Sequence, residues 1–299
     1  MEYGKGVIDE MVKSRKRKME DLIIAALCFV FILLCLMPMV NLLARSLSSS
    51  QAMINNRVSF WPVEFTFESY HYVLKDKAFV RSLWWTALLT LICTVVSLII
   101  TILAAYPLIY DNLKGRKFYN GMMLLTMYFS AGTIPNYLLM KQLNLLDNPL
   151  VLIIPNCLSI FNMIILKSFF FGIPESLRES AQLDGAGPFN ILLKIYLPLS
   201  KPVLATLALF YAVGRWNGFS DALMYITKAK YAPIQLKLYQ IINNRSSIET
   251  SQQEGFAAPV ASEGLKAASV MFATVPILLV YPWLQRYFIS GVTLGAIKE

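Results

Sequence analysis

Long stretches without a charged residue constrain the fold of this chain more than any other feature of its sequence. Five segments contain no Asp, Glu, Lys or Arg: residues 22–44, 82–110, 118–140, 148–166 and 267–285. Because a helix of about 20 mostly apolar residues crosses the roughly 30 Å of hydrocarbon in a bilayer, each segment can span a membrane. A sixth candidate follows Lys201, where Arg215 and Asp221 interrupt an apolar run. The sequence therefore predicts an all-α integral membrane protein with six transmembrane helices.

Composition agrees with this prediction, since 57% of the 299 residues are hydrophobic and 15% are charged. A soluble domain usually carries about 25% charged residues. We expect a basic tail over 1–21, a single six-helix domain over 22–290 and a second tail over 291–299. The predicted spans are 22–44, 82–110, 118–140, 148–170, 202–224 and 267–288.

The orientation prediction rests on the basic block KSRKRK, which directly precedes Leu22. Lys and Arg in short flanks favour the cytosolic side, so both termini are expected in the cytosol. The alternative, that this block binds nucleic acid or lipid head groups, is not needed to explain a net charge of +9. The first span is too long for the apolar region of a signal peptide and has no A-x-A-like site after it. The two long outer loops, 45–81 and 225–266, could either receive an external partner or only cap the helix ends.

Enzymatic chemistry finds little support in the sequence. His71 is the only histidine, and all four cysteines lie inside apolar runs, which argues against a multi-histidine metal site or a disulfide framework. We find no G-x-x-x-x-G-K-[ST], HExxH or GxSxG motif. We expect no catalytic residue, no metal and no cofactor bound by this chain.

The segment between the fourth and fifth predicted spans reads IPESLRESAQLDGAGPFNILLKIYLPLSKP. Its pattern predicts a short amphipathic helix after Pro174, ended by Gly185 in a left-handed conformation, and a second short helix that Pro198 ends. This helix-turn-helix is too short and too polar to cross the membrane, so residues 173–200 are expected on the cytosolic side. Either a partner protein or the lipid surface could cover it.

This segment resembles the signature loop E-A-A-x3-G-x9-I-x-L-P of permease subunits of binding-protein-dependent ABC importers. Ser180 stands where that pattern has its first Ala, and the matching positions are Glu179, Ala181, Gly185, Ile195, Leu197 and Pro198. The stretches FTFESYHYVL, FSAGTIPNYLL, RWNGFSDAL and GVTLGAIKE look like the carbohydrate-uptake branch, in particular its maltose-permease-like second membrane subunit.

The resemblance implies partners and roles that the residues alone do not show. It implies a second homologous permease subunit, two cytosolic ATPase subunits that hold ATP and Mg, and an extracytoplasmic binding protein, all at a bacterial cell membrane. It also implies that the loop couples to the ATPase, with Glu179 as a polar contact, Gly185 as the turn and Pro198 as the link to the fifth span. The expected coupling residues are Glu179, Ala181, Asp184, Gly185, Ala186, Ile195, Leu197 and Pro198.

The substrate path is expected around the charged residues of the fifth span. An ionisable group inside a span usually faces a cavity or a partner, and Arg215 and Asp221 lie beside Trp216 and Asn217. Planar hydrogen-bonding groups and aromatic faces suit sugars, and Asn136 in the third span is a further candidate. The structural alternative is that Asn217 and Asp221, at i,i+4, bond each other or the partner permease.

The resemblance to the carbohydrate-uptake branch implies import of a saccharide, and we expect an oligosaccharide. An acidic oligosaccharide from plant or algal polysaccharide is one candidate, because of Arg215 and the related branches. The alternatives are an ABC permease for a non-sugar solute and an ion-coupled secondary transporter. The last would need more ionisable groups at the midplane than this chain offers.

Overall fold

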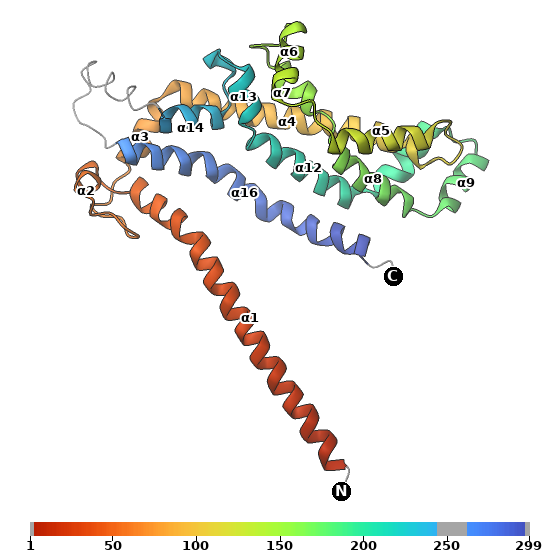
Figure 1. The fold of residues 1–299 in the computed structure, drawn as a ribbon, viewed down its shortest axis with the longest axis horizontal. Helices are drawn as coiled ribbons and strands as arrows, with labels where there is room; N and C mark the ends of the chain where they lie inside the picture. The colour runs from red at the N-terminus through yellow and green to blue at the C-terminus, as the bar shows by residue number, and fades with distance from the viewer. Residues whose placement is uncertain (1–2, 244–261, 297–299) are drawn as a thin grey trace. The chain divides into compact units, whose positions relative to one another are not determined.

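The computed structural model describes residues 3–243 and 262–296, and all regular secondary structure within these ranges is helical. The chain divides into two compact units, which are described separately. The first comprises residues 1–73 and 248–271, and the second comprises residues 74–247 and 272–299. Figure 1 shows the helices of both units.

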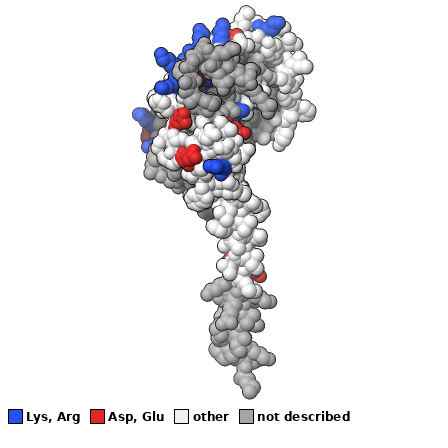
Figure 2. Space-filling model, turned by 90° about the vertical axis from the view of Figure 1, so that its left-hand side faces the viewer, with Lys and Arg blue, Asp and Glu red and all other residues white. Residues whose placement is uncertain are grey.

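The first unit contains α1 (Tyr3–Ser46), α2 (Ser50–Ile54), most of α3 (Glu68–Lys75) and the start of α16 (Ser262–Ala296). The apolar side chains of α1 are exposed from Met19 to Met37. Figure 2 shows the described part of this helix as a nearly uncharged column. A long, exposed and apolar helix is typical of a segment that contacts lipid or another membrane helix.

The helix α1 begins at Tyr3, so it includes most of the predicted tail over 1–21 and continues unbroken into the first predicted span. After Gly6 the tail contains no Gly or Pro and is rich in Lys, Arg, Met and Glu, which favour helix.

Arg45 at the end of α1 forms an ion pair of 2.6 Å with Glu263 of α16. Ser46 and Tyr70 share a hydrogen bond of 2.9 Å between their hydroxyls.

The second unit is built around α4 (Lys77–Ala105), α8 (Ile160–Phe171) and α12 (Lys201–Trp216), which pack against one another. One face of α4 is buried, at intervals of three to four residues, and much of it is small or hydroxylated. Small side chains let membrane helices approach closely. The buried residues of α4 are Phe79, Ser82, Thr86, Leu89, Cys93, Ser97, Thr101 and Ala105.

Shorter elements complete the second unit. Between α4 and α8 lie η1 (Pro107–Ile109), α5 (Arg116–Tyr128), α6 (Thr133–Gln142), α7 (Leu150–Ile153) and η2 (Ile154–Asn156). Between α8 and α12 lie α9 (Glu175–Leu183), α10 (Pro188–Ile191), the π-helical η3 (Leu192–Tyr196) and α11 (Leu197–Leu199). After α12 come α13 (Ser220–Tyr225), η4 (Ala229–Tyr231) and α14 (Ile234–Asn243).

Two hydrophobic clusters lie at different levels of α4. The Tyr106 cluster contains Ala105, Tyr106, Phe170, Tyr196 and Leu207, with their buried neighbours. The Leu89 cluster contains Leu89, Cys93, Leu152, Ala222 and Tyr225, with theirs. The first lies at the C-terminal end of α4, and the second lies near its middle.

Three of the predicted spans are interrupted in the structure. In the described residues, three helices are long and apolar enough to cross a membrane, or five if two bent pairs each count as one span. The segment 148–170 bends by 47° between η2 and α8. The segment 202–224 breaks between α12 and α13, and the segment 118–140 breaks between α5 and α6. A membrane-spanning role for α5 and α6, and with it a count of six, stays a prediction.

Candidate functional site

The loop between α8 and α12 forms the first candidate site. Its first helix, α9, ends in a Schellman motif, in which Ala186 N–H donates to Ala181 C=O at 2.8 Å and Gly185 N–H donates to Gln182 C=O at 3.0 Å. Gly185 has φ +81°, as the sequence predicts for a glycine that ends a helix in the left-handed region.

The second helix of this loop extends further than predicted. Helical structure runs from Pro188 to Leu199, and the chain bends by 82° into α12 only at Ser200. Pro198 therefore does not end the helix, and that prediction is wrong. Pro198 lies in the first turn of α11, directly after the π-helical turn of η3, where the regular i→i−4 ladder is already interrupted.

The eight residues expected to couple to an ATPase fall into two groups. Glu179, Asp184, Gly185 and Pro198 are exposed. The partly buried group, Ala181, Ala186, Ile195 and Leu197, packs against the Tyr106 cluster. Leu183 (90% exposed) and Phe189 (63% exposed) add apolar area to the exposed group. The loop thus presents exposed apolar and acidic side chains on one side, while its other side packs against the Tyr106 cluster.

Sequence reasoning missed the residues that fasten this loop to α4 and α8. The Tyr106 hydroxyl donates to the Pro188 carbonyl at 2.8 Å and pairs with the Tyr110 hydroxyl at 2.5 Å. The Arg178 guanidinium lies 5.0 Å from the centre of the Tyr110 ring and pairs with Glu175. The rings of Tyr106, Phe170 and Tyr196 meet edge to face. The sequence feature that could have pointed to these residues is the run AAYPLIY at the end of the second predicted span, which contains Tyr106 and Tyr110.

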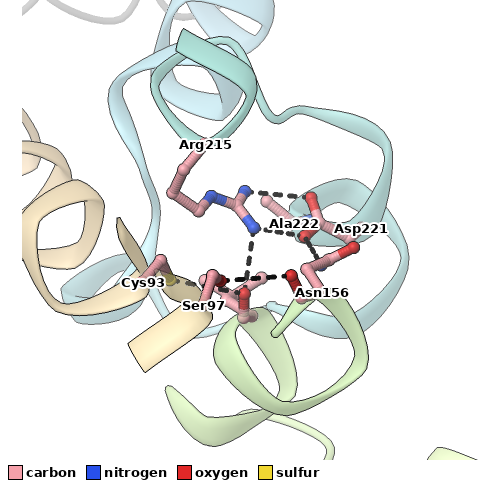
Figure 3. Close-up of polar contacts among 7 residues, drawn as sticks. Cys93, Ser97, Asn156, Arg215, Asp221 and Ala222 are labelled. Atoms are coloured by element: carbon pink, nitrogen blue, oxygen red, sulfur yellow. Dashed lines mark hydrogen bonds and ion pairs between the residues drawn. The ribbon is translucent and has the colours of Figure 1, made fainter. Parts of the chain in front are cut away.

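The second candidate site surrounds Arg215, at the end of α12 (Figure 3). Its guanidinium makes a two-pronged ion pair with Asp221 of α13: Nη1 lies 2.5 Å from Oδ2 and Nη2 lies 3.1 Å from Oδ1. Nη1 also donates to the Leu152 carbonyl at 3.1 Å. Only 5% of the Arg215 side chain is exposed, compared with 20% for Asp221.

Neighbouring groups complete the Arg215 network. The Asn156 amide donates to Asp221 Oδ2 at 3.1 Å, and the Ala222 N–H donates to Oδ1 at 2.9 Å. The Cys93 thiol of α4 lies 3.8 Å from the Leu152 carbonyl, and Ser97 Oγ lies 3.5 Å from the Asn156 carbonyl, as Figure 3 shows. The network thus joins α12, α13, the α7–η2 segment and α4.

Gly218 lies against the Arg215 guanidinium. A Cβ at this position would lie 2.3 Å from Arg215 Nη2 and 2.7 Å from Cζ. The turn between α12 and α13 therefore passes so closely over the guanidinium that any side chain at position 218 would have to displace it.

The other predicted substrate-path residues lie apart from this ion pair. Trp216 Nε1 donates to the Ala273 carbonyl at 3.3 Å, and the Asn217 amide donates to the Val213 carbonyl at 3.1 Å. Asn136 is exposed on α6. The structural alternative in which Asn217 bonds Asp221 is not what the structure shows, since Asp221 bonds Arg215, Asn156 and Ala222 instead.

Asp147, in a predicted outer loop, clamps the segment after α13. It accepts hydrogen bonds from the Thr227 N–H and hydroxyl, both at 2.6 Å, and from the Lys228 N–H at 2.9 Å. These bonds stabilise the charged carboxylate and lower the pKa of Asp147 to about 2. Within the described residues, no group of three or more His, Cys, Asp or Glu side chains could hold a metal ion.

Comparison with known proteins identifies the family. Residues 78–294 match the family model described as "Binding-protein-dependent transport system inner membrane component". The chain is 37% identical to the polygalacturonan/rhamnogalacturonan transport system permease protein YtcP of Bacillus subtilis, over 95% of this chain and 99% of that protein. It is 38% identical to the protein LplC of the same organism, over 88% and 89% of the two chains.

A solved structure supports the same assignment. A chain of a bacterial ABC transporter involved in the import of the acidic polysaccharide alginate superposes with a TM-score of 0.87 and 34% sequence identity, over 92% of this chain and 98% of that one. The family model covers more than half of the chain, and two relatives exceed 30% identity over nearly the full length. The chain therefore belongs to the family of inner membrane components of binding-protein-dependent transport systems.

Proposed function

We propose that this chain is a permease subunit of an ATP-driven ABC importer that takes up an oligosaccharide. The observation that carries the proposal is the surface of the α9–α11 loop, where exposed Leu183, Phe189, Glu179 and Asp184 stand opposite a side packed into the Tyr106 cluster. A loop that is exposed on one side and packed against membrane helices on the other can transmit a conformational change of a bound partner to those helices. In this proposal that partner is a separate ATPase subunit, which holds ATP and Mg.

Membership of the family supports the remaining partners in this proposal. An extracytoplasmic binding protein delivers the substrate, and a second, homologous permease subunit completes the pathway. Both termini lie in the cytosol in this arrangement, with the α9–α11 loop on the same side. Binding of ATP shifts the equilibrium between two states of the complex, and the loop carries that difference to the membrane helices.

The substrate proposal rests on the relatives. The YtcP protein is named for polygalacturonan and rhamnogalacturonan, and the solved transporter is described as importing the acidic polysaccharide alginate. These polymers share carboxylated sugar units. We therefore propose an acidic oligosaccharide as the substrate class.

The coupling role is tested by Glu179→Lys, which reverses the charge of an exposed position on α9. We expect the variant complex to insert into the membrane normally while ATP-dependent uptake is lost and the ATPase subunit is retained poorly on purification. Glu20→Lys is the matched control, because Glu20 is also exposed and lies on the predicted cytosolic side but outside the loop. Wild-type uptake and wild-type ATPase retention by Glu179→Lys would contradict the coupling role.

A further inference from the structure

The break between α5 and α6 is an exposed feature of the second unit that the proposed function does not use. The chain leaves the α5 helix at Phe129, which has an extended backbone, and re-enters a helix at Thr133. Gly132 has φ +88° and ψ 174°, a conformation essentially restricted to glycine. The glycine therefore fixes the break, since any side chain at this position would be strained.

Contacts of the two flanking helices give the level of this break along α4. At the α5 end, Asn120 accepts a hydrogen bond of 2.7 Å from Lys167 of α8, and Met123 packs against the Tyr106 cluster. At the α6 end, Met140 packs against the Leu89 cluster, and the Tyr137 ring stacks on Tyr225 with 6.1 Å between centroids.

The break therefore lies at a level between the two clusters, which corresponds to the part of α4 from Cys93 to Ala105. This part of α4 belongs to the apolar segment Lys77–Ile109, which is long enough to cross a membrane. The interruption of α5–α6 is consequently at membrane depth rather than at a membrane surface.

Irregular backbone at membrane depth has few permitted environments. The last carbonyls of α5 and the first N–H groups of α6 lack partners within their own helices. Hydrocarbon cannot hydrogen-bond them, so such a break occurs only where it lines a water-filled cavity or is buried in protein. Neither α5 nor α6 has a buried residue in this chain. The break must therefore face either water or another subunit.

The side chains at the break favour a wet, saccharide-binding environment. Tyr128 and Phe129 are 78% and 74% exposed, and Ser130 and Asn136 are exposed beside them. Aromatic rings pack on the apolar CH faces of a sugar, while hydroxyl and amide groups bond its hydroxyls. The segment carries no acidic side chain between Tyr128 and Asn136 that would repel a carboxylated sugar.

We propose that the α5–α6 break, with Tyr128, Phe129, Ser130 and Asn136, is a saccharide-binding subsite on the translocation pathway. The proposal rests on the proposed import function and assigns it a location other than the Arg215 network. There the cation and carboxylate already bond each other. At the break the Ser130 hydroxyl accepts a hydrogen bond of 3.2 Å from the Gly132 N–H and can still donate its own proton to a ligand, and the Tyr128 and Phe129 rings are exposed.

Thiol labelling tests whether the break is wet and whether sugar reaches it. The complex is assembled with its partner subunits, the four native cysteines are replaced, and Ser130→Cys is exposed to a charged, water-soluble thiol reagent. We expect labelling, and we expect trigalacturonate to slow it at least about threefold, with maltotriose as the uncharged comparison. Absence of labelling, which is the result expected if the partner permease covers the break, overturns the proposal. Labelling that neither sugar slows also overturns it.

Transport kinetics provide the second test. Tyr128→Ala and Phe129→Ala should each raise KM for trigalacturonate uptake about tenfold, with the maximal rate and the ATPase retention little changed, since each removes one ring from the ligand. Phe118→Ala is the matched control, because Phe118 is similarly exposed on α5 but lies in its first turn, away from the break. Unchanged KM in both variants overturns the subsite. A wild-type complex that takes up neither sugar counts instead against the proposed function.

Discussion

Replacement of Asp221 by Asn tests whether the Arg215 network stabilises the packing of its helices rather than binding the substrate. We call this stabilising role a structural lock. The carboxylate of Asp221 is the counterion of a guanidinium whose side chain is 5% exposed. Arg cannot lose its proton in a protein, so the charge would remain buried after the substitution. The new NH₂ group would also face donors in either orientation: in place of Oδ2 it meets Arg215 Nη1 and the Asn156 amide, and in place of Oδ1 it meets Arg215 Nη2 and the Ala222 N–H.

The expected cost is large for a single substitution. Breaking a buried ion pair by removing one partner costs about 3 to 5 kcal/mol. At about 2 to 4 °C per kcal/mol for a unit of this size, the melting temperature of the detergent-solubilised complex should fall by about 6 to 20 °C. The exposed pair Arg116–Asp111 offers the control, since its carboxylate is 84% exposed. Asp111→Asn should change the stability by no more than about 1 kcal/mol.

Two further measurements separate a lock from a substrate contact. The double variant Arg215→Met with Asp221→Leu removes both charges and should recover most of the lost stability, because buried pairs can often be replaced by apolar residues. If Asp221→Asn instead melted within about 2 °C of the wild type and lost uptake, the carboxylate would be a substrate contact. That result would refute the lock.

The remaining predictions concern three other contacts. Tyr106→Phe removes the bond to the Pro188 carbonyl, so it should cost about 1 kcal/mol in stability and reduce sugar uptake per ATP hydrolysed in proteoliposomes. An unchanged ratio of uptake to ATP hydrolysis would contradict a role for this bond in coupling. Gly218→Ala should displace the Arg215 guanidinium and lower the melting temperature by more than Gly214→Ala, whose Cβ meets open space. The clamp at Asp147 should be intact above about pH 4 and lost towards about pH 2, because its folded pKa is depressed; hydrogen exchange at Thr227 and Lys228, compared with Asp147→Asn, measures this loss.

The sequence predicts the apolar helices well but not where they break. Charge-free stretches predicted the long apolar helices α1, α4 and α16, because hydropathy reports transfer into lipid whatever the detailed backbone. The same measure continues across Gly132 and Gly218, where a positive φ or a close contact interrupts the helix. A glycine inside an apolar run counts as neutral in composition, although its backbone decides the geometry.

The Arg215–Asp221 pair shows a second limit of sequence reasoning. Spacing rules pair residues at i,i+3 and i,i+4 on a continuous helix, and they favoured Asn217 with Asp221. The helix ends at Trp216 and a new one begins at Ser220, so the i,i+4 rule does not apply. The turn at Gly218 instead brings together two residues that are six apart. For the α9–α11 loop the reverse holds, since its turn chemistry is local and Gly185 was predicted correctly.

The helix α4 links the two candidate sites mechanically. Tyr106, directly after α4, bonds the loop at the Pro188 carbonyl, while Cys93 and Ser97 contact the backbone of the Arg215 network. At 1.5 Å per residue, Tyr106 and Cys93 are about 20 Å apart along the helix. A push on the loop that tilts α4 must therefore either strain the network or move it as a unit. Because the two-pronged ion pair tolerates little distortion, we expect α12, α13 and the α7–η2 segment to move together with α4, and the unburied α5–α6 break to be the place where the pathway changes shape.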